Sequence, residues 1–295
     1  MTLLSQQSKI GFIGSGKVAG NLAANFIEKG YVVAAVSSKN NTSARALAQR
    51  LPSIISYTSN QSVVNECDVV FVAVPDDAIA SSVSGLSWAK RHGVVHCSGA
   101  RTLECLDGAA RQGAMVASFH PLQTFVNSIA PPTQLEGIGF AVAGDTRLVE
   151  WLQEVVISVG GIKLFIKDEM RSLYHASAVM ACGLLAGLVG LAAEMWEPLG
   201  IDRDEALKRL IPLIRSTVDS LDQQGLPLAI TGPFVRGDVE TVKSHLGATD
   251  ANSGEMGRAY AALALASLHI ARQQGGITDE DYESIKTLLS PENRQ

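Results

Sequence analysis

The sequence predicts a doubly wound α/β domain followed by an all-helical domain. In the first half, short runs rich in β-branched residues alternate with amphipathic stretches, which is the pattern of a parallel sheet covered by helices on both faces. A glycine-rich turn joins the first such run to the first amphipathic stretch. Beyond about residue 165 the strand pattern stops and long helical patterns begin. We therefore expect two domains, residues 1–165 and 166–295.

The individual elements follow from these patterns in order along the chain. Right-handed crossovers through the amphipathic stretches keep the strands parallel. In the second half, Asp202 and Thr278 have the spacing of helix N-caps. Strands are expected at Lys9–Ile13, Tyr31–Val36, Ile54–Tyr57, Asp68–Val74, Val94–Cys97, Met115–Phe119 and Ile138–Val142, and helices at Lys17–Glu28, Ser43–Arg50, Arg101–Arg111, Glu169–Trp196, Asp202–Leu221 and Ser253–Gln273.

Composition excludes several classes of protein. The chain has 295 residues, of which 46% are hydrophobic, so it is not disordered. Its net charge of -5 argues against a nucleic-acid partner. The four cysteines form no Cys-x-x-Cys pair, so we expect no metal site. Scattered thiols and a polar N-terminal segment without a signal peptide suggest a cytoplasmic protein.

One segment has the length of a short membrane span. Residues Ala176–Ala193 contain no charge, and Gly183 and Gly187 have the spacing of a helix-packing face in lipid. No aromatic belt flanks this segment. We interpret it as a helix of small residues packed by other helices, with no membrane partner. Because it is apolar on several faces, we expect it near the centre of a homodimer.

The first strand runs directly into a Gly-x-Gly-x-x-Ala turn and then into a helix. Gly14 permits the tight turn, Gly16 lets backbone N–H groups approach a diphosphate, and Ala19 takes the small position where helix packs on strand. The diphosphate then lies at the positive N-terminal end of the helix. This context predicts a dinucleotide site formed by Gly14, Ser15, Gly16, Lys17, Val18 and Ala19.

The end of the second strand favours NADP, as NADPH, over NAD. An NAD site needs an acidic residue about 20 residues beyond the glycines to bind the ribose 2′-hydroxyl, and no acid occurs between Glu28 and Glu66. Ser37, Ser38 and Lys39 instead offer hydroxyls and a cation, which suit a 2′-phosphate. The alternative is that Lys39 is an ordinary solvated charge.

Two further strand ends belong to the same edge of the predicted sheet. Val74 and Pro75 follow the fourth strand, and Ser98 follows the fifth. Ligands of open parallel sheets bind beyond the carboxyl ends of the strands. We therefore expect Val74 and Pro75 to flank the cofactor and Ser98 to face its nicotinamide end. Asp76 and Asp77 suit the caps of the short helix that follows equally well.

His120 is a candidate for proton transfer at the end of the sixth strand. Gln123 and Thr124 follow it closely, so an imidazole, an amide and a hydroxyl stand together where the sheet edge meets the site. We expect Gln123 and Thr124 to bind the substrate. The alternative is that His120 caps a turn and Pro121 opens a helix.

His175 is the second candidate, early on the first long helix of the second half. An imidazole gives or takes a proton near neutral pH. The alternative is a histidine that is hydrogen-bonded in a domain interface.

A rigid loop rich in glycine and proline joins two later helices and carries Arg236. We expect Arg236 to clamp a substrate carboxylate or a cofactor phosphate, or else to be solvated. Asp238, at the end of this loop, suits the N-cap of a helix over Val239–Leu246.

Six segments carry a resemblance to known families. GFIGSGKVAGNLA, VSSKN and CDVVFVAVPDDAI resemble the pyrroline-5-carboxylate reductase and β-hydroxyacid dehydrogenase superfamily. FHPLQTF, RSLYHASAV and TGPFVRGDVETV resemble an uncharacterised bacterial family that pairs a Rossmann-like NADP-binding domain with a helical domain of unknown function. The resemblance covers nearly the whole chain. It implies a Rossmann-like domain, a helical domain of the 6-phosphogluconate dehydrogenase C-terminal type, and a homodimer formed through the helices.

One departure from the resemblance bears on activity. Hydroxyacid dehydrogenases place a catalytic lysine, with an asparagine one turn on, where this chain has His175 and Val179. We expect an NADP(H)-dependent oxidoreductase that transfers hydride between nicotinamide and a small carbonyl or imine, with His175 as the acid and His120 as the other candidate. The alternative is a non-catalytic NADP(H)-binding sensor. An interaction scaffold would leave the glycine turn without a role.

Overall fold

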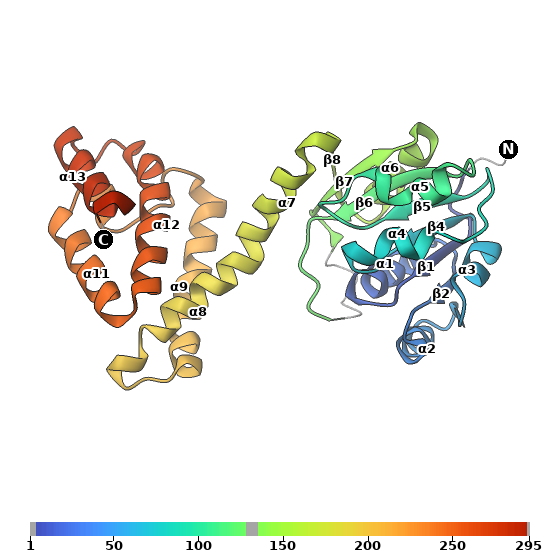
Figure 1. The fold of residues 1–295 in the computed structure, drawn as a ribbon, viewed down its shortest axis with the longest axis horizontal. Coiled ribbons are helices and arrows are strands. Elements are labelled where there is room, and N and C mark those ends of the chain that lie inside the picture. Colours follow the sequence, from blue (N-terminus) through green and yellow to red (C-terminus); the bar gives the residue numbers. More distant parts are fainter. Residues whose placement is uncertain (1–3, 128–134, 294–295) are drawn as a thin grey trace. The chain divides into compact units, whose positions relative to one another are not determined.

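The computed structural model describes residues 4–127 and 135–293, and it divides the chain into two compact units. The first unit, Met1–Cys182, contains the sheet, and the second, Gly183–Gln295, is helical (Figure 1). The predicted fold class, a doubly wound α/β domain followed by a helical one, is confirmed. The predicted boundary at residue 165 marks the change from strands to helices, whereas the compact units divide further on, inside the long helix.

The described part of the first unit contains an eight-stranded sheet. Its strands follow the order β3-β2-β1-β4-β5-β6-β7-β8. Neighbouring strands are parallel except β6 and β7, which are antiparallel. The chain moves outward from β1 through β2 and β3 and then restarts at β4, so β1 and β4 form the switch point where such sheets bind ligands. The strands are β1 Ile10–Ile13, β2 Val33–Ser37, β3 Ile55–Tyr57, β4 Val69–Val72, β5 Gly93–His96, β6 Met115–Pro121, β7 Gly139–Gly144 and β8 Ile162–Leu164.

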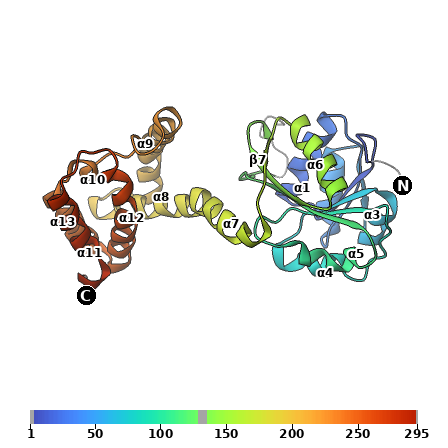
Figure 2. The same ribbon diagram turned by 90° about the horizontal axis from the view of Figure 1, so that it is seen from above.

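Helices cover both faces of this sheet, each against its own apolar core. Figure 2 shows α1 and α6 on one face and α3, α4 and α5 on the other. Because both faces are covered, the strands are apolar on both sides, as the sequence indicates. The helices of the first unit are α1 Lys17–Glu28, α2 Asn41–Arg50, α3 Asn60–Glu66, α4 Ile79–Val83, α5 Asp107–Ala110, α6 Thr146–Ser158 and α7 Arg171–Val179.

Several expected elements differ in detail. The helix expected at Arg101–Arg111 is a 3-10 turn, Leu103–Leu106, followed by the short α5. Strand β8, which pairs with β7, was not expected. It has three residues, too few to give a periodic signal in the sequence. Strand β6 runs on through His120 and Pro121, since both pair with β7. No helix opens at Pro121, so that alternative is wrong.

The second unit consists of helices, several of which begin at a side-chain N-cap. Asp202 accepts a hydrogen bond from the N–H of Glu205, Asp238 accepts one from the N–H of Thr241, and Thr278 accepts one from the N–H of Asp281, so the three predicted N-caps are confirmed. Its core lies between α11, α12 and α13. The helices are α8 Leu185–Glu194, α9 Arg203–Gln224, α10 Pro233–Arg236, α11 Val239–Asn252, α12 Gly254–Arg272 and α13 Asp279–Leu289.

The long helix expected at Glu169–Trp196 is interrupted and exposed. A π-helical segment, Met180–Leu184, separates α7 from α8. The whole helix, Asp168–Leu199, is long and apolar enough to cross a membrane by length and composition, with a mean hydropathy of 2.0 in its most apolar window. Only 6% of that window is buried. The expectation of a helix packed tightly by others is therefore not met within the single chain.

Candidate functional site

The glycine turn after β1 has the geometry of a dinucleotide loop. Gly14 has a φ of 103°, and a Cβ there would lie 2.2 Å from the carbonyl oxygen of Ala73, so a side chain is excluded. Gly16 is the N-cap of α1 and has open space where a side chain would be. Helix α1 has no acidic residue in its first turn and no side-chain cap at Gly16. Its N-terminal N–H groups and its dipole therefore favour an anion at this end.

A pocket of about 850 Å³ lies at this switch point. It brings together the glycine turn, the end of β2 and the end of β4, which the sequence predicted as three parts of one site. Seven of the predicted cofactor residues line it: Gly14, Ser15, Gly16, Ser38, Lys39, Val74 and Pro75. Of the others, Ala19 is buried where α1 packs on the sheet, and Lys17 and Val18 stand in the first turn of α1 outside the lining.

Ser37 differs from the other residues expected at the 2′-phosphate. It is 1% exposed, and its hydroxyl donates to Oδ1 of Asn60 at 2.8 Å. Ser38 and Lys39 are turned toward the pocket. Ser43, at the start of α2, links the loops, because its hydroxyl meets those of Ser15 at 2.8 Å and Ser38 at 3.3 Å. The hydroxyls of Ser15 and Ser38, which both border the pocket, are therefore linked through Ser43, a residue that sequence alone did not identify.

The hydroxyl of Ser98, expected to face the nicotinamide end, is hydrogen-bonded within the protein. Its hydroxyl donates to Oδ2 of Asp76 at 2.7 Å and accepts from the N–H groups of Ala100 and Arg101. The single hydroxyl proton is thereby used within the protein. Ser98 holds the turn after β5 against the 3-10 turn Asp76–Ala78 that follows β4, so the two strand ends are fixed relative to each other.

Two histidines that are far apart in the sequence meet beside Gly99. A Cβ at Gly99 would lie 2.8 Å from Nε2 of His120 and 2.6 Å from Nδ1 of His175. The two ring centroids are 5.8 Å apart at an interplanar angle of 81°. Nδ1 of His175 is buried without a hydrogen-bond partner in the described residues. The two predicted candidates are thus brought together, and the glycine between them is what leaves room for both rings.

His120 is held neutral by its surroundings. Burial, together with the neighbouring His175 and the Arg171 guanidinium, lowers the pKa of His120 to about 4, while Asp76 opposes the shift. Nδ1 of His120 lies 2.8 Å from the hydroxyl oxygen of Tyr174. At neutral pH the ring can donate or accept a hydrogen bond, but it carries no positive charge.

Arg171 fastens α7 to the sheet below this pair. Its side chain is 1% exposed and is the largest that is fully buried. Nε donates to Asp168 at 2.8 Å, and Nη2 donates to the hydroxyl of Ser118 on β6. Arg171, Tyr174 and His175 stand three and four residues apart, so they share one face of the helix. That i, i+3, i+4 spacing was the available sequence signal for Arg171 and Tyr174, and it was missed.

The remaining predicted substrate residues lie on other elements. Gln123 and Thr124 lie in the exposed loop after β6, where the Thr124 N–H donates to Oε1 of Gln123. Arg236 closes the short helix α10 in the second unit. Among the described residues there is no group of three or more His, Cys, Asp or Glu that could hold a metal ion.

Two family models match separate parts of the chain. Residues 9–99 match the family described as NADP oxidoreductase, coenzyme F420-dependent. Residues 138–267 match a domain of unknown function, DUF2520. No curated protein matches the chain.

Solved structures with low sequence identity share the fold. A protein from Bacteroides fragilis, proposed to be an NADP oxidoreductase, has a TM-score of 0.73 at 24% identity, with 90% of this chain and 99% of that chain covered. A pyrroline-5-carboxylate reductase from Streptococcus pyogenes has a TM-score of 0.63 at 17% identity, covering 91% and 100%. A reductive aminase from Aspergillus terreus, in complex with NADPH and ethyl-5-oxohexanoate, has a TM-score of 0.58 at 14% identity, covering 96% and 92%. At these identities the likeness establishes the fold.

Proposed function

Because the chain pairs a domain of the NADP oxidoreductase, coenzyme F420-dependent type with a helical domain of unknown function, we propose that it is an NADP(H)-dependent oxidoreductase acting on a small carbonyl or imine. The observation that carries this proposal is the pocket of about 850 Å³ at the β1/β4 switch point. It adjoins a glycine turn that excludes any side chain at Gly14. A dinucleotide diphosphate is the ligand that such a turn and helix end suit.

The cofactor is NADPH, with its 2′-phosphate at the end of β2. Ser38 and Lys39 border the pocket there, and no carboxylate stands in the first turn of α2 to repel a phosphate. A hydroxyl and an ammonium group form charge-assisted hydrogen bonds with a phosphate. The solved reductive aminase, whose fold is similar, is in complex with NADPH, which supports the same choice.

The reduction needs a hydride and a proton, and the cofactor supplies the hydride when bound. This chain supplies a position for the substrate and a proton donor. The candidates are the imidazoles of His120 and His175, whose nitrogens border Gly99 at the end of β5. The carboxyl end of β5 is on the ligand side of the sheet, so a carbonyl or imine bound beside Gly99 would meet both rings. Gln123 and Thr124, in the loop that follows β6, are proposed to bind the rest of the substrate.

A substrate screen with matched variants tests this function. The wild-type protein, titrated with NADPH by calorimetry, is screened against small imines, keto acids and aldehydes. Replacing the histidine that transfers the proton by alanine should lower kcat by about 10²–10⁴-fold. The affinity for NADPH should be unchanged, because neither ring lines the cofactor pocket. His269→Ala, an exposed position on α12, serves as the control. Tight NADPH binding without turnover would favour the sensor function instead.

The sensor is kept as the second candidate because of one observation. The residue that a hydroxyacid dehydrogenase would need as lysine is His175 here. A sensor would bind NADPH and NADP⁺ with different affinities or change its conformation or partner with the redox state. Equal affinities and identical proteolysis patterns in the two states would exclude it.

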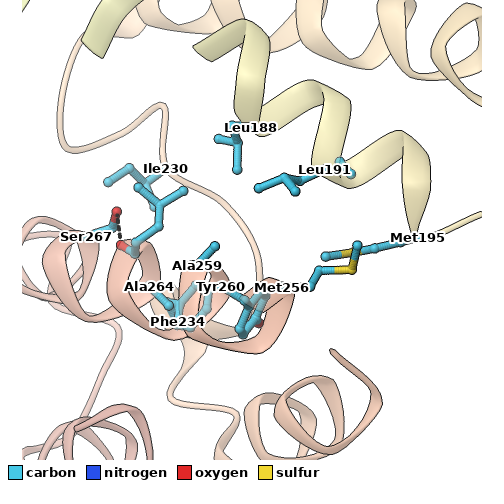
Figure 3. Close-up of a pocket in the computed structure, with 12 residues that line it drawn as sticks. Leu188, Leu191, Met195, Ile230, Phe234, Met256, Ala259, Tyr260, Ala264 and Ser267 are labelled. Carbon is cyan, nitrogen blue, oxygen red and sulfur yellow. Dashed lines mark hydrogen bonds between the residues drawn. The ribbon is translucent and has the colours of Figure 1, made fainter. Parts of the chain in front are cut away.

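We further propose that the protein is a cytoplasmic homodimer assembled through its helices. The long helix exposes a row of large apolar residues within one chain: Met180 at 63%, Leu184 at 60%, Leu185 at 40% and Leu188 at 40%. The part of this helix that forms α8 borders, together with α12, an apolar pocket of about 430 Å³ (Figure 3). Its lining includes Leu188, Leu191, Met195, Met256 and Leu263. Exposed apolar surface of this extent calls for a cover, and a second copy offers the same surface in a two-fold arrangement.

A further inference from the structure

A tyrosine, Tyr174, contacts His120 at the site beside Gly99. Tyr174 immediately precedes His175 on α7, and its hydroxyl oxygen lies 2.8 Å from Nδ1 of His120. The two rings meet edge to face, with centroids 5.5 Å apart and an interplanar angle of 90°. Nε2, the other nitrogen of His120, borders Gly99. The phenol therefore contacts the nitrogen of the imidazole that does not border Gly99.

The positions of the protons in this pair follow from the donors available. Burial raises the pKa of Tyr174, so the phenol keeps its proton at neutral pH. Nδ1 of His120 is the hydrogen-bond partner of this hydroxyl in the part of the chain that the structure describes. In the tautomer on which the relay depends, the hydroxyl donates to Nδ1 and the neutral ring carries its own proton on Nε2. That proton is the one that borders Gly99.

Charged and titratable groups around the pair come from α7, from the turn after β4 and from β5. Arg171 and His175 on α7 disfavour a positive charge on His120, and Asp76 after β4 favours it. His96 on β5 interacts electrostatically with His120 and is itself neutral, because burial lowers the pKa of His96 to about 4. With these neighbours His120 is not available as an imidazolium acid at pH 7. A neutral imidazole can release Nε2–H only if Nδ1 gains a proton at the same time.

We propose that Tyr174 supplies the proton of the reduction through His120, an inference that rests on the proposed function. NADPH gives its hydride to the carbon of the C=O or C=N group and becomes NADP⁺. The Nε2–H bond of His120 breaks, and its proton joins the substrate oxygen or nitrogen. The Oη–H bond of Tyr174 breaks as that proton joins Nδ1. A water molecule then gives a proton to Nε2, and its hydroxide passes into the solvent. Nδ1 returns its proton to the phenolate. His120 is the catalytic residue, and Tyr174, which acts through it, is a positioning residue.

The relay predicts a pH profile that an imidazolium acid would not give. An imidazolium loses its proton near neutral pH, so a rate that depends on it falls above about pH 7. The relay keeps its proton until the phenol ionises, at about pH 10 or higher. We expect the wild-type kcat to stay level from roughly pH 6 to 9. A kcat that falls above neutrality overturns the relay.

Tyr174→Phe is the variant that interrupts the relay with little change in shape. We expect kcat to fall by about 10²-fold while the Kd for NADPH is unchanged. Tyr282→Phe, which removes a hydroxyl from α13 and leaves the ring beneath Arg272 in place, is the matched control and should keep full kcat. Tyr174→Phe with wild-type kcat would overturn the relay.

Nitrogen-15 NMR of the NADPH-bound protein gives a readout that does not need turnover. We expect His120 to be neutral at pH 7 with its proton on Nε2, and its Nδ1 resonance to shift in Tyr174→Phe. His245, whose Nδ1 lies 2.9 Å from the hydroxyl of Tyr260, is the internal reference and should not shift. A charged His120, or a proton on Nδ1, overturns the relay even if a substrate is reduced. The expected NMR result without any reduction overturns the proposed function and leaves the hydrogen bond as structural.

Discussion

Single residues determine which cofactor and which protonation states this protein can use. Lys39 is an exposed side chain that lines the pocket beside the glycine turn, and we propose that its positive charge distinguishes a 2′-phosphate from a hydroxyl. His96 lies at the opposite extreme, fully buried with both ring nitrogens lacking a partner among the described residues. Each of these extremes leads to a measurable consequence.

Lys39→Ala tests the 2′-phosphate site. The wild-type protein should bind NADPH at least about tenfold more tightly than NADH, which is about 1.4 kcal/mol. The variant should lose most of that preference, because NADH has no 2′-phosphate for Lys39 to contact. Calorimetric titration with both cofactors measures it. Lys29→Ala, at the far end of α1, is the control, and equal affinities of the wild-type protein for NADPH and NADH would refute the assignment.

His96 should make the fold sensitive to acid. Burial lowers its pKa to about 4 in the folded state, whereas an unfolded histidine protonates near about 6.5. The unfolded state therefore binds more protons between these values, so the stabilisation is present above about pH 6.5 and is lost as pH falls toward about 4. By then the free energy of unfolding has dropped by on the order of 3 kcal/mol. Urea unfolding at several pH values should show this slope, and His96→Leu should flatten it; an unchanged slope contradicts the prediction.

Gly99→Ala tests the space shared by the two imidazoles. An added Cβ would lie 2.6 Å from Nδ1 of His175 and 2.8 Å from Nε2 of His120, so at least one ring must move. We expect turnover to fall by about tenfold or more, because small misplacements at a reacting centre are costly. Gly85→Ala would strain a positive φ, so Gly190→Ala, where a Cβ meets nothing within 4 Å, is the better control. The measurement is kcat with NADPH affinity determined alongside.

At the scale of elements, α7 is the part of the chain that completes the site. Arg171 ties its first turn to Ser118 on β6 and to Asp168, and one turn later Tyr174 and His175 reach His120 and Gly99. The helix contributes two side chains to the site because its N-terminus is anchored in the sheet. The anchor also places a cation close to His96 and His120, which lowers the pKa of both.

Arg171→Met separates these two roles of the anchor. Removing the cation should raise the pKa of His120 and His96, because the neighbouring positive charge that opposes protonation is gone. Loss of the hydrogen bonds should also speed amide exchange in α7. NMR titration and hydrogen exchange measure the two effects. Arg111→Met, which removes an exposed i,i+4 pair with Asp107, should change neither; unchanged histidine titrations in Arg171→Met would refute the electrostatic part.

At the scale of the whole molecule, the exposed apolar helix is the feature that needs explanation. Only 6% of its most apolar window is buried in the single chain. A second copy of the chain would cover such a surface without any further partner. The proposed assembly therefore accounts for a helix that the single chain leaves open.

Leu184→Glu and Leu188→Glu test the homodimer. We expect the wild-type protein to sediment as a dimer at micromolar concentration, and each variant to shift toward monomer, because burying a carboxylate in an apolar interface is unfavourable. Ile157→Glu is the control, since Ile157 is 62% exposed, close to the 60% of Leu184, but lies on α6 of the first unit. A wild-type monomer, or variants that remain dimeric, would contradict the proposal.

The sequence by itself determined the features that depend on neighbours along the chain. The strand, glycine turn and helix over residues 9–28 were predictable because each step is local, and so were the caps at Asp202 and Asp238, which bond to residues three positions on. The tertiary structure decided what depends on burial and on distant contacts. It placed His120 within hydrogen-bond distance of Tyr174. It also joined Ser98 to Asp76 and Ser37 to Asn60 by hydrogen bonds. It also made His120 neutral, because desolvation acts on a folded environment that no spacing of residues reveals.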